Sequence, residues 1–259
     1  MIKFFKILPA LFILLSKVSK AQILFCYKNN KLPISLRICG IFCTLIFYPK
    51  GLFVKPKQSL GKRVADCLYN LGSIYIKFGQ TLSTRPDIVG VDAAKSLKYL
   101  QDKLPPFDSK IARNRITECF GKDVSDIFDY FNDKPIAAAS IAQVHKALLK
   151  SGEEVAVKIQ RPDIAKKYER DIYLLGCIAQ VIESTMPKTK RLNLKEVIKL
   201  FRQTMKFELD LTSEASAASR IHDNFLEDQT LHIPKVHWAL TSSDIITFEW
   251  IDGFSIYDK

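Results

Sequence analysis

The most informative stretch of this chain is Ile136-Ala-Ala-Ala-Ser-Ile-Ala-Gln-Val144, followed by Glu154-Val-Ala-Val-Lys-Ile-Gln-Arg-Pro162. The pattern predicts a tight turn of small residues, a strand, a reverse turn at Lys150-Ser-Gly-Glu153 and a second strand that carries Lys158. The first turn is built from alanine, which permits a close approach of the backbone but not the positive φ angles that glycine allows. The sequence therefore predicts an antiparallel hairpin with one lysine in its second strand.

Lys158 lies in the middle of an apolar strand. Because side chains alternate along a strand, Val155, Val157 and Ile159 share one face and Ala156, Lys158 and Gln160 share the other. Burying an unpaired ammonium is costly, so this lysine needs a partner. The strand alone is compatible with two interpretations: Lys158 contacts a phosphate, or it is a lysine on an edge strand that extends into solvent.

The segment Ala137-Ala-Ala-Ser140 has two readings as well. It suits a close contact of helix or strand, or a phosphate loop that offers backbone N–H groups and the Ser140 hydroxyl to an anion. Protein kinases place a Gly-rich loop and a strand lysine in this order around the nucleotide phosphates. The combination with Lys158 favours the phosphate loop.

Two further groups of polar residues suit such a site. In Phe207-Glu-Leu-Asp-Leu-Thr-Ser-Glu214, Asp210 and Glu214 are predicted to share one face of a helix, and Glu208 another. With Lys158 available, Glu214 is the expected ion-pair partner, whereas a solvated acidic face is the alternative. Lys77 and Gln80 are predicted opposite the apolar stripe of an earlier helix, where most such residues face solvent. Because Ile74 and Ile76 flank that side, a covering element is the alternative, and Lys77 is a candidate partner for Glu208.

Periodicity and turn residues predict an α+β fold. The expected elements are a helix from Lys62 to about Arg85, two helical stretches to Gly121 with Asp108 as an N-cap, three strands within 131–161, a helix through about Ser184, a long helix from Asn193 to about Phe225, and strands Lys235–Leu240 and Ile245–Trp250. This layout predicts a protein-kinase-like N-lobe: an antiparallel five-strand sheet with a helix between its third and fourth strands.

The excess of positive over negative charge lies entirely in an N-terminal arm. Of the 39 Lys and Arg residues, twelve lie in residues 1–63, which contain no Asp or Glu, so the other 27 balance the 27 acidic residues. The apolar runs 7–15 and 38–48 are shorter than the ~20 residues that a spanning helix needs. Basic and aliphatic residues together favour an anionic membrane surface over nucleic acid. A secretory signal ending at Ser19-Lys20-Ala21 is the alternative.

The cysteines and histidines predict no metal site. The six cysteines form no C-x-x-C pair, and Cys39 and Cys43 have no histidine nearby in the sequence. We expect reduced thiols that pack as small apolar side chains.

The motifs together resemble the UbiB (aarF) family of atypical kinases. Lys77-Phe-Gly-Gln80 matches its K-x-G-Q motif, Ala137-Ala-Ala-Ser140 its Ala-rich loop, Glu208-Leu-Asp210 its E-x-D motif, and Glu214 the carboxylate that pairs with the strand lysine Lys158. The resemblance implies a kinase-like fold, membrane association, a role in ubiquinone biosynthesis, and ATPase or small-molecule kinase activity. In that family the K-x-G-Q helix covers the nucleotide site.

The resemblance implies ATP or ADP as the ligand and assigns residues to it. The residues expected to bind the nucleotide are Ile136, Ala137, Ala138, Ala139, Ser140, Ile141, Ala142, Gln143, Val144, Lys158 and Glu214; those expected to regulate the site are Lys77, Gln80, Glu208 and Asp210. The expected domains are a membrane-associating arm (1–60), a helical extension with the K-x-G-Q motif (61–130) and the N-lobe (131–259).

The sequence also departs from a kinase. It ends nine residues after Trp250, where the hinge to a C-lobe is expected, and contains no H-x-D…N loop and no D-F-G motif. We expect that the C-lobe is absent, that the Mg²⁺ ligands are missing with it, and that the chain is inactive alone or works with a separate C-lobe polypeptide. A non-catalytic nucleotide-binding or membrane-surface module is the alternative. No nucleic acid is expected as a partner, and the expected location is the cytoplasmic face of a membrane.

Overall fold

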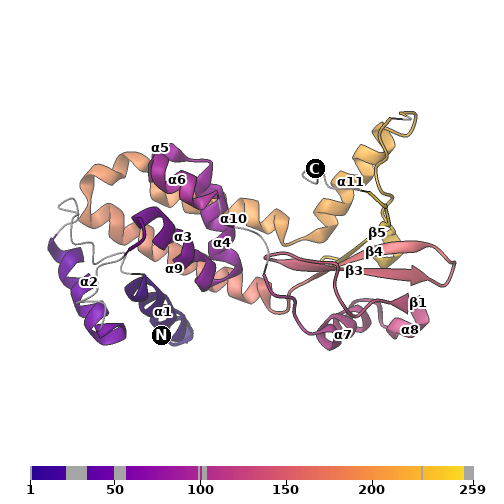
Figure 1. Cartoon of the computed structure of the whole chain (residues 1–259), viewed down its shortest axis with the longest axis horizontal. Helices are drawn as coiled ribbons and strands as arrows, with labels where there is room; N and C mark the ends of the chain where they lie inside the picture. Colours follow the sequence, from indigo (N-terminus) through magenta and orange to yellow (C-terminus); the bar gives the residue numbers. More distant parts are fainter. Residues whose placement is uncertain are drawn as a thin grey trace. The chain divides into compact units, whose positions relative to one another are not determined.

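The computed structural model describes residues 2–21, 34–49, 57–98, 100, 104–228 and 230–253. The chain divides into two compact units (Figure 1). The helical unit comprises Met1–Asp102 and Ala165–Gln203, and the sheet unit comprises Lys103–Ile164 and Thr204–Lys259. The domain boundaries expected after residues 60 and 130 do not coincide with this division, because a later pair of helices packs with the N-terminal ones.

The helical unit is built from nine helical segments among the described residues. They are α1 (Ile2–Lys20), α2 (Ile34–Phe47), α3 (Leu60–Leu71), α4 (Ser73–Ser83), α5 (Pro86–Val89), α6 (Val91–Leu97), α9 (Ile164–Thr185), the 3-10 helix η2 (Pro187–Leu192) and α10 (Leu194–Glu208), whose last turn belongs to the sheet unit. The single helix predicted from Lys62 to Arg85 is two helices. Gly72 separates them with a φ of 110°, a backbone conformation that residues with a side chain rarely adopt.

Helix α4 packs on more sides than its sequence predicts. Ile74 and Ile76, expected to flank the polar side, are 1% and 0% exposed. A methyl group added at Gly79 would meet the side chains of Leu68 and Leu100, so glycine allows a close approach at this position. Neighbours therefore surround α4, and a single apolar stripe does not describe it.

The sheet unit contains the antiparallel five-strand sheet that the sequence predicts. The strands are β1 (Phe128–Phe131), β2 (Ala137–Ala138), β3 (Ala142–Leu149), β4 (Glu154–Gln160) and β5 (Ile245–Glu249), in the order β1-β3-β4-β5, with β2 paired to β3. The unit also contains α7 (Ser109–Phe120), α8 (Val124–Ile127), α11 (Leu211–Asn224) and the 3-10 helix η3 (Trp238–Leu240). Helix α7 begins at the predicted N-cap, because the Asp108 carboxylate accepts a hydrogen bond from Lys110 N.

The prediction of a strand at Lys235–Leu240 is wrong. Residues 235–240 form only a single bridge, Val236 to Phe248, before η3 begins. The chain turns there because the amide of Leu240 and the hydroxyl of Thr241 both donate to the His237 carbonyl. The alanine loop supplies the fifth strand as β2, so α9 follows the fourth strand and not the third.

The sheet has two chemically different faces. On the core face, Val155, Val157 and Ile159 pack with Ala112 and Ile116 of α7, which lies beneath the sheet in Figure 1. The opposite face carries Lys158 and is called the lysine face below. Val144 lies on it as the register partner of Lys158, and Ala137 as the register partner of Val144. Ala156 lies on the same face, two residues before Lys158 on β4. The alternation predicted for Val155–Gln160 is confirmed.

Candidate functional site

Lys158 and Glu214 form an ion pair on the lysine face. The Lys158 ammonium lies 2.7 Å from Oε1 and 2.6 Å from Oε2 of Glu214, so both carboxylate oxygens are engaged. The two side chains are 25% and 43% exposed. The predicted pair is therefore present, and it stays accessible to a ligand.

The local chain path places Glu214 at this point. Gln160, two residues beyond Lys158, donates from Nε2 to the Leu209 carbonyl at 2.6 Å. The amide of Leu211 donates to the Ser243 carbonyl at 3.0 Å. These two bonds hold the start of α11 against the ends of β4 and β5, and Glu214 lies one turn further on.

Asp210 caps α11, so the helix predicted from Asn193 to Phe225 is interrupted. Its carboxylate accepts hydrogen bonds from Thr212 N at 3.0 Å and Thr212 Oγ1 at 2.6 Å, and its own backbone is extended, with φ −112° and ψ 98°. Glu208 is the last residue of α10. The expectation that Asp210 and Glu214 share a face within one continuous helix is therefore wrong, because Asp210 precedes the first turn of α11.

Apolar contacts fix α11 on the lysine face. Leu211 and Ala215 are fully buried against Ile246 of β5 and Val236. Ile246 is the register partner of Lys158, so α11 covers β5 on the same face that carries the lysine. Val144 and Ala156 remain half-buried beside it. The lysine face is thus covered over β5 and less completely covered over β3 and β4.

The alanine loop satisfies some of its own backbone groups. The amide of Ile136 donates to the Val144 carbonyl and that of Ala139 to the Ala142 carbonyl, both at 2.8 Å. Ser140 is 0% exposed, so its hydroxyl lies inside the protein, and the contact with an anion that we expect for it stays a prediction. The sequence suggested a series of free N–H donors, but part of that series is used within the hairpin, because β2 pairs with β3.

Arg161 holds the alanine loop, and it was not predicted as a site residue. Its guanidinium donates to the Ala139 carbonyl from Nε at 3.0 Å and from Nη2 at 2.8 Å, and to the Pro105 carbonyl at 2.9 Å. Burial lowers the pKa of this guanidinium. No sequence signal separates such an arginine from a surface one, because its acceptors are backbone carbonyls.

The remaining loop residues belong to the interior. Ile141, Ala142 and Gln143 are 7%, 1% and 0% exposed. Gln143 accepts from the Phe107 amide at 2.9 Å, and its Nε2 lies 2.9 Å from His145 Nε2. His145 Nδ1 donates to the Asn132 carbonyl at 2.8 Å, which leaves Nε2 to accept from Gln143. Burial lowers the pKa of His145, so the imidazole is held neutral.

The two predicted residues of the K-x-G-Q motif lie in the helical unit, on α4. Gln80 is half-buried and donates from Nε2 to the Leu100 carbonyl at 3.2 Å, so of the two expectations for this side chain the structure favours a covered position. Lys77 belongs to the helical unit and Glu208 to the sheet unit. Their pairing remains a prediction.

The lysine face can bind an anion next to an apolar group. The Lys158 ammonium is oriented by Glu214, and Val144 and Ala156 provide apolar surface beside it. The alternation along the strand placed Ala156 on the same face as Lys158, but Ala156 was not among the residues expected to bind the nucleotide. Among the described residues there is no group of three His, Cys, Asp or Glu side chains placed to hold a metal ion.

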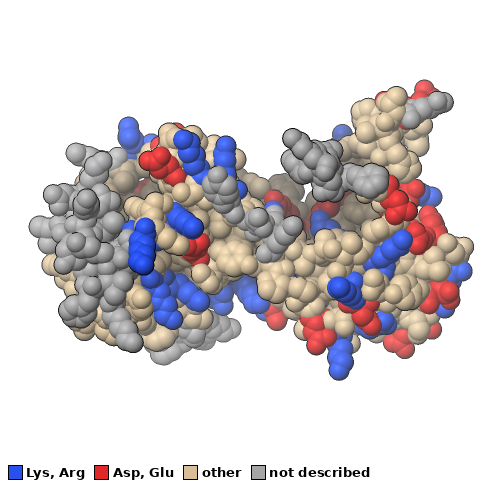
Figure 2. Space-filling view, in the orientation of Figure 1, with Lys and Arg blue, Asp and Glu red and all other residues tan. Residues whose placement is uncertain are grey.

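Figure 2 shows Lys and Arg side chains interspersed with Asp and Glu over the strands and α7 on the visible face. Several charged side chains of the sheet unit form ion pairs, among them Lys146 with Glu154 at 2.8 Å and Lys150 with Asp129 at 3.4 Å. This face of the sheet unit is therefore not a basic patch of the kind that binds a nucleic-acid backbone.

Comparison with known proteins gave one family and several relatives. A family profile described as the ABC1 atypical kinase-like domain matches residues 99–259. A protein called "Probable protein kinase UbiB" from Cellvibrio japonicus (strain Ueda107) is 39% identical over 230 residues, which cover 89% of this chain and 41% of the relative. One of the same name from Shewanella piezotolerans is 42% identical over 200 residues, covering 77% of this chain and 36% of the relative.

The chain thus spans about two fifths of the length of these curated relatives. A solved structure titled "The complex structure of Rv3197-erythromycin from Mycobacterium tuberculosis" is similar with a TM-score of 0.48 and 23% identity, over 85% of this chain and 51% of that one.

Proposed function

The chain belongs to the ABC1 atypical kinase-like family, and from the geometry of the lysine face we propose that it binds an adenine nucleotide there. The observation that carries this proposal is the accessible Lys158–Glu214 ion pair beside half-buried Val144 and Ala156. A strand lysine held by a helix carboxylate is the arrangement with which kinases contact nucleotide phosphates.

Each residue has a role in the proposal. Lys158 pairs with phosphate oxygens, because an ammonium on a strand is a compact point charge. Glu214 keeps that ammonium over the lysine face before the ligand arrives. Val144 and Ala156 give the base an apolar surface. The β2–β3 turn, fixed by Arg161 through the Ala139 carbonyl, forms the rim on the phosphate side.

We propose that these residues bind the nucleotide but do not by themselves hydrolyse it or transfer its phosphate. No H-x-D…N and no D-F-G motif occurs in the 259 residues, so the catalytic aspartate and the usual Mg²⁺ ligands are not among them. A polypeptide that carries those motifs, in the same longer protein or separate, would supply them. Together they would form a UbiB-type kinase or ATPase that supports ubiquinone biosynthesis, as the family resemblance implies.

Titration with fluorescent analogues of ATP and ADP tests the proposal. The 259-residue chain should bind at least one of them saturably and with 1:1 stoichiometry, and unlabelled nucleotide should displace it. Absence of saturable binding by both analogues would contradict the proposal.

A second candidate function is attachment to an anionic membrane surface through α1 and α2. Helix α2 has an inverted pattern: Gly40, Cys43 and Thr44 are buried, whereas large apolar side chains point outward. The outward side chains are Ile38 (61% exposed), Ile41 (43%), Phe42 (64%), Leu45 (55%) and Ile46 (53%).

Helix α1 also exposes large apolar side chains: Phe12 and Ile13 are 61% and 51% exposed, whereas Leu14 and Ser19 are buried. A soluble surface helix shows the opposite pattern. Small residues between helices and large apolar residues outside are typical of helices in contact with lipid. The basic, acid-free sequence of residues 1–63 suits anionic headgroups.

None of the described helices is both long and apolar enough to cross a bilayer. From the exposed apolar side chains and the basic sequence we propose that α1 and α2 lie in the membrane–water interface, with the outward side chains of α2 among the acyl chains. The expected location is the cytoplasmic face of a membrane, where a nucleotide is available to the sheet unit.

A further inference from the structure

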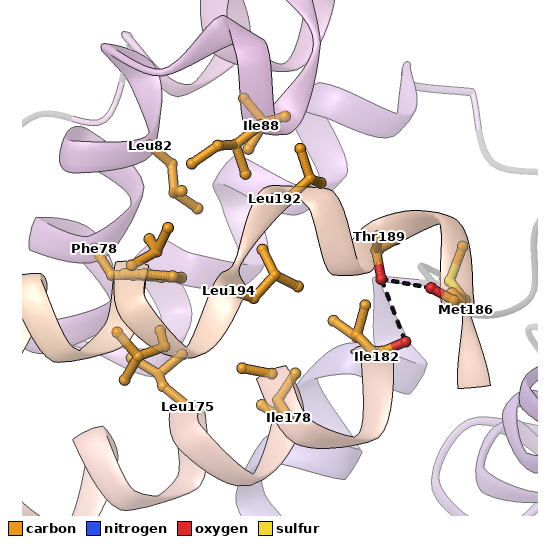
Figure 3. A pocket seen from close by; sticks show the side chains of 14 residues that line it. Phe78, Leu82, Ile88, Leu175, Ile178, Ile182, Met186, Thr189, Leu192 and Leu194 are labelled. Carbon is orange, nitrogen blue, oxygen red and sulfur yellow. Dashed lines mark hydrogen bonds between the residues drawn. The ribbon is translucent and has the colours of Figure 1, made fainter. Parts of the chain in front are cut away.

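The helical unit contains a cavity that neither the sequence motifs nor the proposed nucleotide site uses. Its volume is about 320 Å³. Figure 3 shows how its walls arise: Phe78 and Leu82 of α4 and Ile88 of α5 face Leu175 and Ile178 of α9, with Leu194 of α10 between them. All of these residues belong to the helical unit, so the cavity is a feature of one compact body.

The lining is almost entirely hydrocarbon. Thr189 is its one polar side chain, and the Thr189 hydroxyl donates to the Met186 carbonyl at 2.7 Å (Figure 3). That donor is therefore already used within the protein. A water molecule in a cavity needs two to four polar partners, and the side chains of this lining do not offer them.

An empty space of this size is unfavourable, because the lining atoms have no partners for dispersion contacts on one side. Closure by movement of the walls is opposed by buried neighbours: Ala179 and Ile198 are 4% and 8% exposed. The Tyr168 hydroxyl also ties α9 to α10 by a hydrogen bond to the Arg202 carbonyl at 2.6 Å. The cavity is thus held open by the packing of α4, α9 and α10.

We propose that this cavity is a binding site for an uncharged, unbranched or lightly branched hydrocarbon chain. A volume of about 320 Å³ accommodates about ten methylene groups, each taken to be roughly as large as a water molecule at ~30 Å³. A charged head group would find no polar partner inside the cavity. The ligand therefore either has no charged head group or keeps it at the mouth of the cavity, in contact with water. Because Phe78 and Leu82 lie on the helix that carries Lys77 and Gln80, the bound chain touches the helix of the K-x-G-Q motif.

The experiment compares two probes of equal length, 1-decanol and 1,10-decanediol, by titration calorimetry with the full chain. Decanol leaves its one hydroxyl at the mouth, whereas the diol must bury a hydroxyl without a partner. Decanol should bind with 1:1 stoichiometry, and the diol at least about tenfold more weakly, since an unpaired buried hydroxyl costs more than 1.4 kcal/mol. Equal affinity for the two probes, or no binding of decanol, would overturn the proposal.

Two substitutions on α9 locate the site. Ala179→Phe places a ring in the cavity and should abolish decanol binding while the melting temperature stays the same or rises. Val181→Phe adds the same ring at a position that is 48% exposed, and should bind decanol like the unmodified chain. Should Ala179→Phe not fold, Val197→Phe replaces it at another wall position. Decanol binding that survives in the folded cavity variant would place the probe elsewhere and contradict the assignment.

Discussion

Lys158 and Glu214, 56 residues apart in the sequence, connect the middle strand β4 to α11 through an ion pair that engages both carboxylate oxygens. The pair has a definite geometry because Gln160 fixes the chain just before α11 and Asp210 caps that helix. It lies on the lysine face and is not sealed from solvent. Partly exposed ion pairs stabilise a fold by about 1 kcal/mol or less. We therefore expect this pair to contribute more to ligand binding than to the stability of the fold.

Glu214→Gln separates these two contributions. The free energy of unfolding should change by less than about 1 kcal/mol, because the pair is partly exposed. Affinity for the nucleotide should fall about tenfold, because an amide no longer holds the ammonium in place. Denaturant titration and nucleotide titration measure the two effects. Glu227→Gln, at an exposed position of the same unit, should change neither. A large loss of stability in Glu214→Gln with unchanged affinity would assign the pair a structural role.

Arg161→Met should loosen the alanine loop. The carbonyls of Ala139 and Pro105 lose their donor, and we expect a loss of about 1–3 kcal/mol in the free energy of unfolding. Amide hydrogen exchange within residues 137–142 should also accelerate.

The control for Arg161 is Arg85→Met, which removes an exposed ion pair with Asp87. It should cost less than about 1 kcal/mol and leave exchange in the loop unchanged. Equal stability losses in the two variants, with no change of exchange in the loop, would show that Arg161 does not hold it.

The buried His145 makes the sheet unit sensitive to acid. Burial lowers its pKa in the folded state below the ordinary value of 6.5, so below that pH the unfolded chain binds more protons than the folded chain. The free energy of unfolding should therefore decrease as the pH falls from 7.5 to 5.5. In His145→Gln this decrease should be smaller. Lys122→Gln, at an exposed position of the same unit, should keep the slope of the unmodified chain. A steeper slope in His145→Gln would contradict this account.

The outward face of α2 should bind anionic vesicles. Phe42→Glu with Leu45→Glu places two carboxylates among the exposed apolar side chains, and sedimentation with phosphatidylserine-containing vesicles should fall at least about tenfold. Leu200→Glu introduces a carboxylate at an exposed leucine of α10 and should sediment like the unmodified chain. Undiminished sedimentation of the double variant would exclude α2 from the contact.

The sequence predicts the strands and their faces better than the breaks in the helices. The alternation along Val155–Ile159 depends on local geometry, and the structure confirms it. The breaks at Gly72 and Asp210 depend on one backbone conformation each, and a helix-period pattern continues through both. The strand expected at 235–240 failed because capping bonds around His237 turn the chain after one bridge.

The candidate site was predictable where it depends on side-chain charge. Lys158 and Glu214 are complementary ionisable groups, and their pairing followed from the need of a strand lysine for a partner. The burial of Ser140 and the role of Arg161 were not predictable, because both depend on how β2 folds against β3. Backbone carbonyls have no signature in the sequence, so the residues that bind them have none either.

The affinity of Lys158→Met for the nucleotide decides whether the nucleotide binds on the lysine face. The full chain, Lys158→Met and Lys150→Met are titrated with the same fluorescent nucleotide under the same conditions. Lys150→Met is a matched control, because it removes one positive charge from the β3–β4 turn. The Lys150 ammonium forms an exposed ion pair with Asp129 at 3.4 Å. We expect Lys158→Met to lose at least about tenfold in affinity, and Lys150→Met to bind like the unmodified chain. Equal affinity of all three proteins would contradict the placement of the nucleotide on the lysine face.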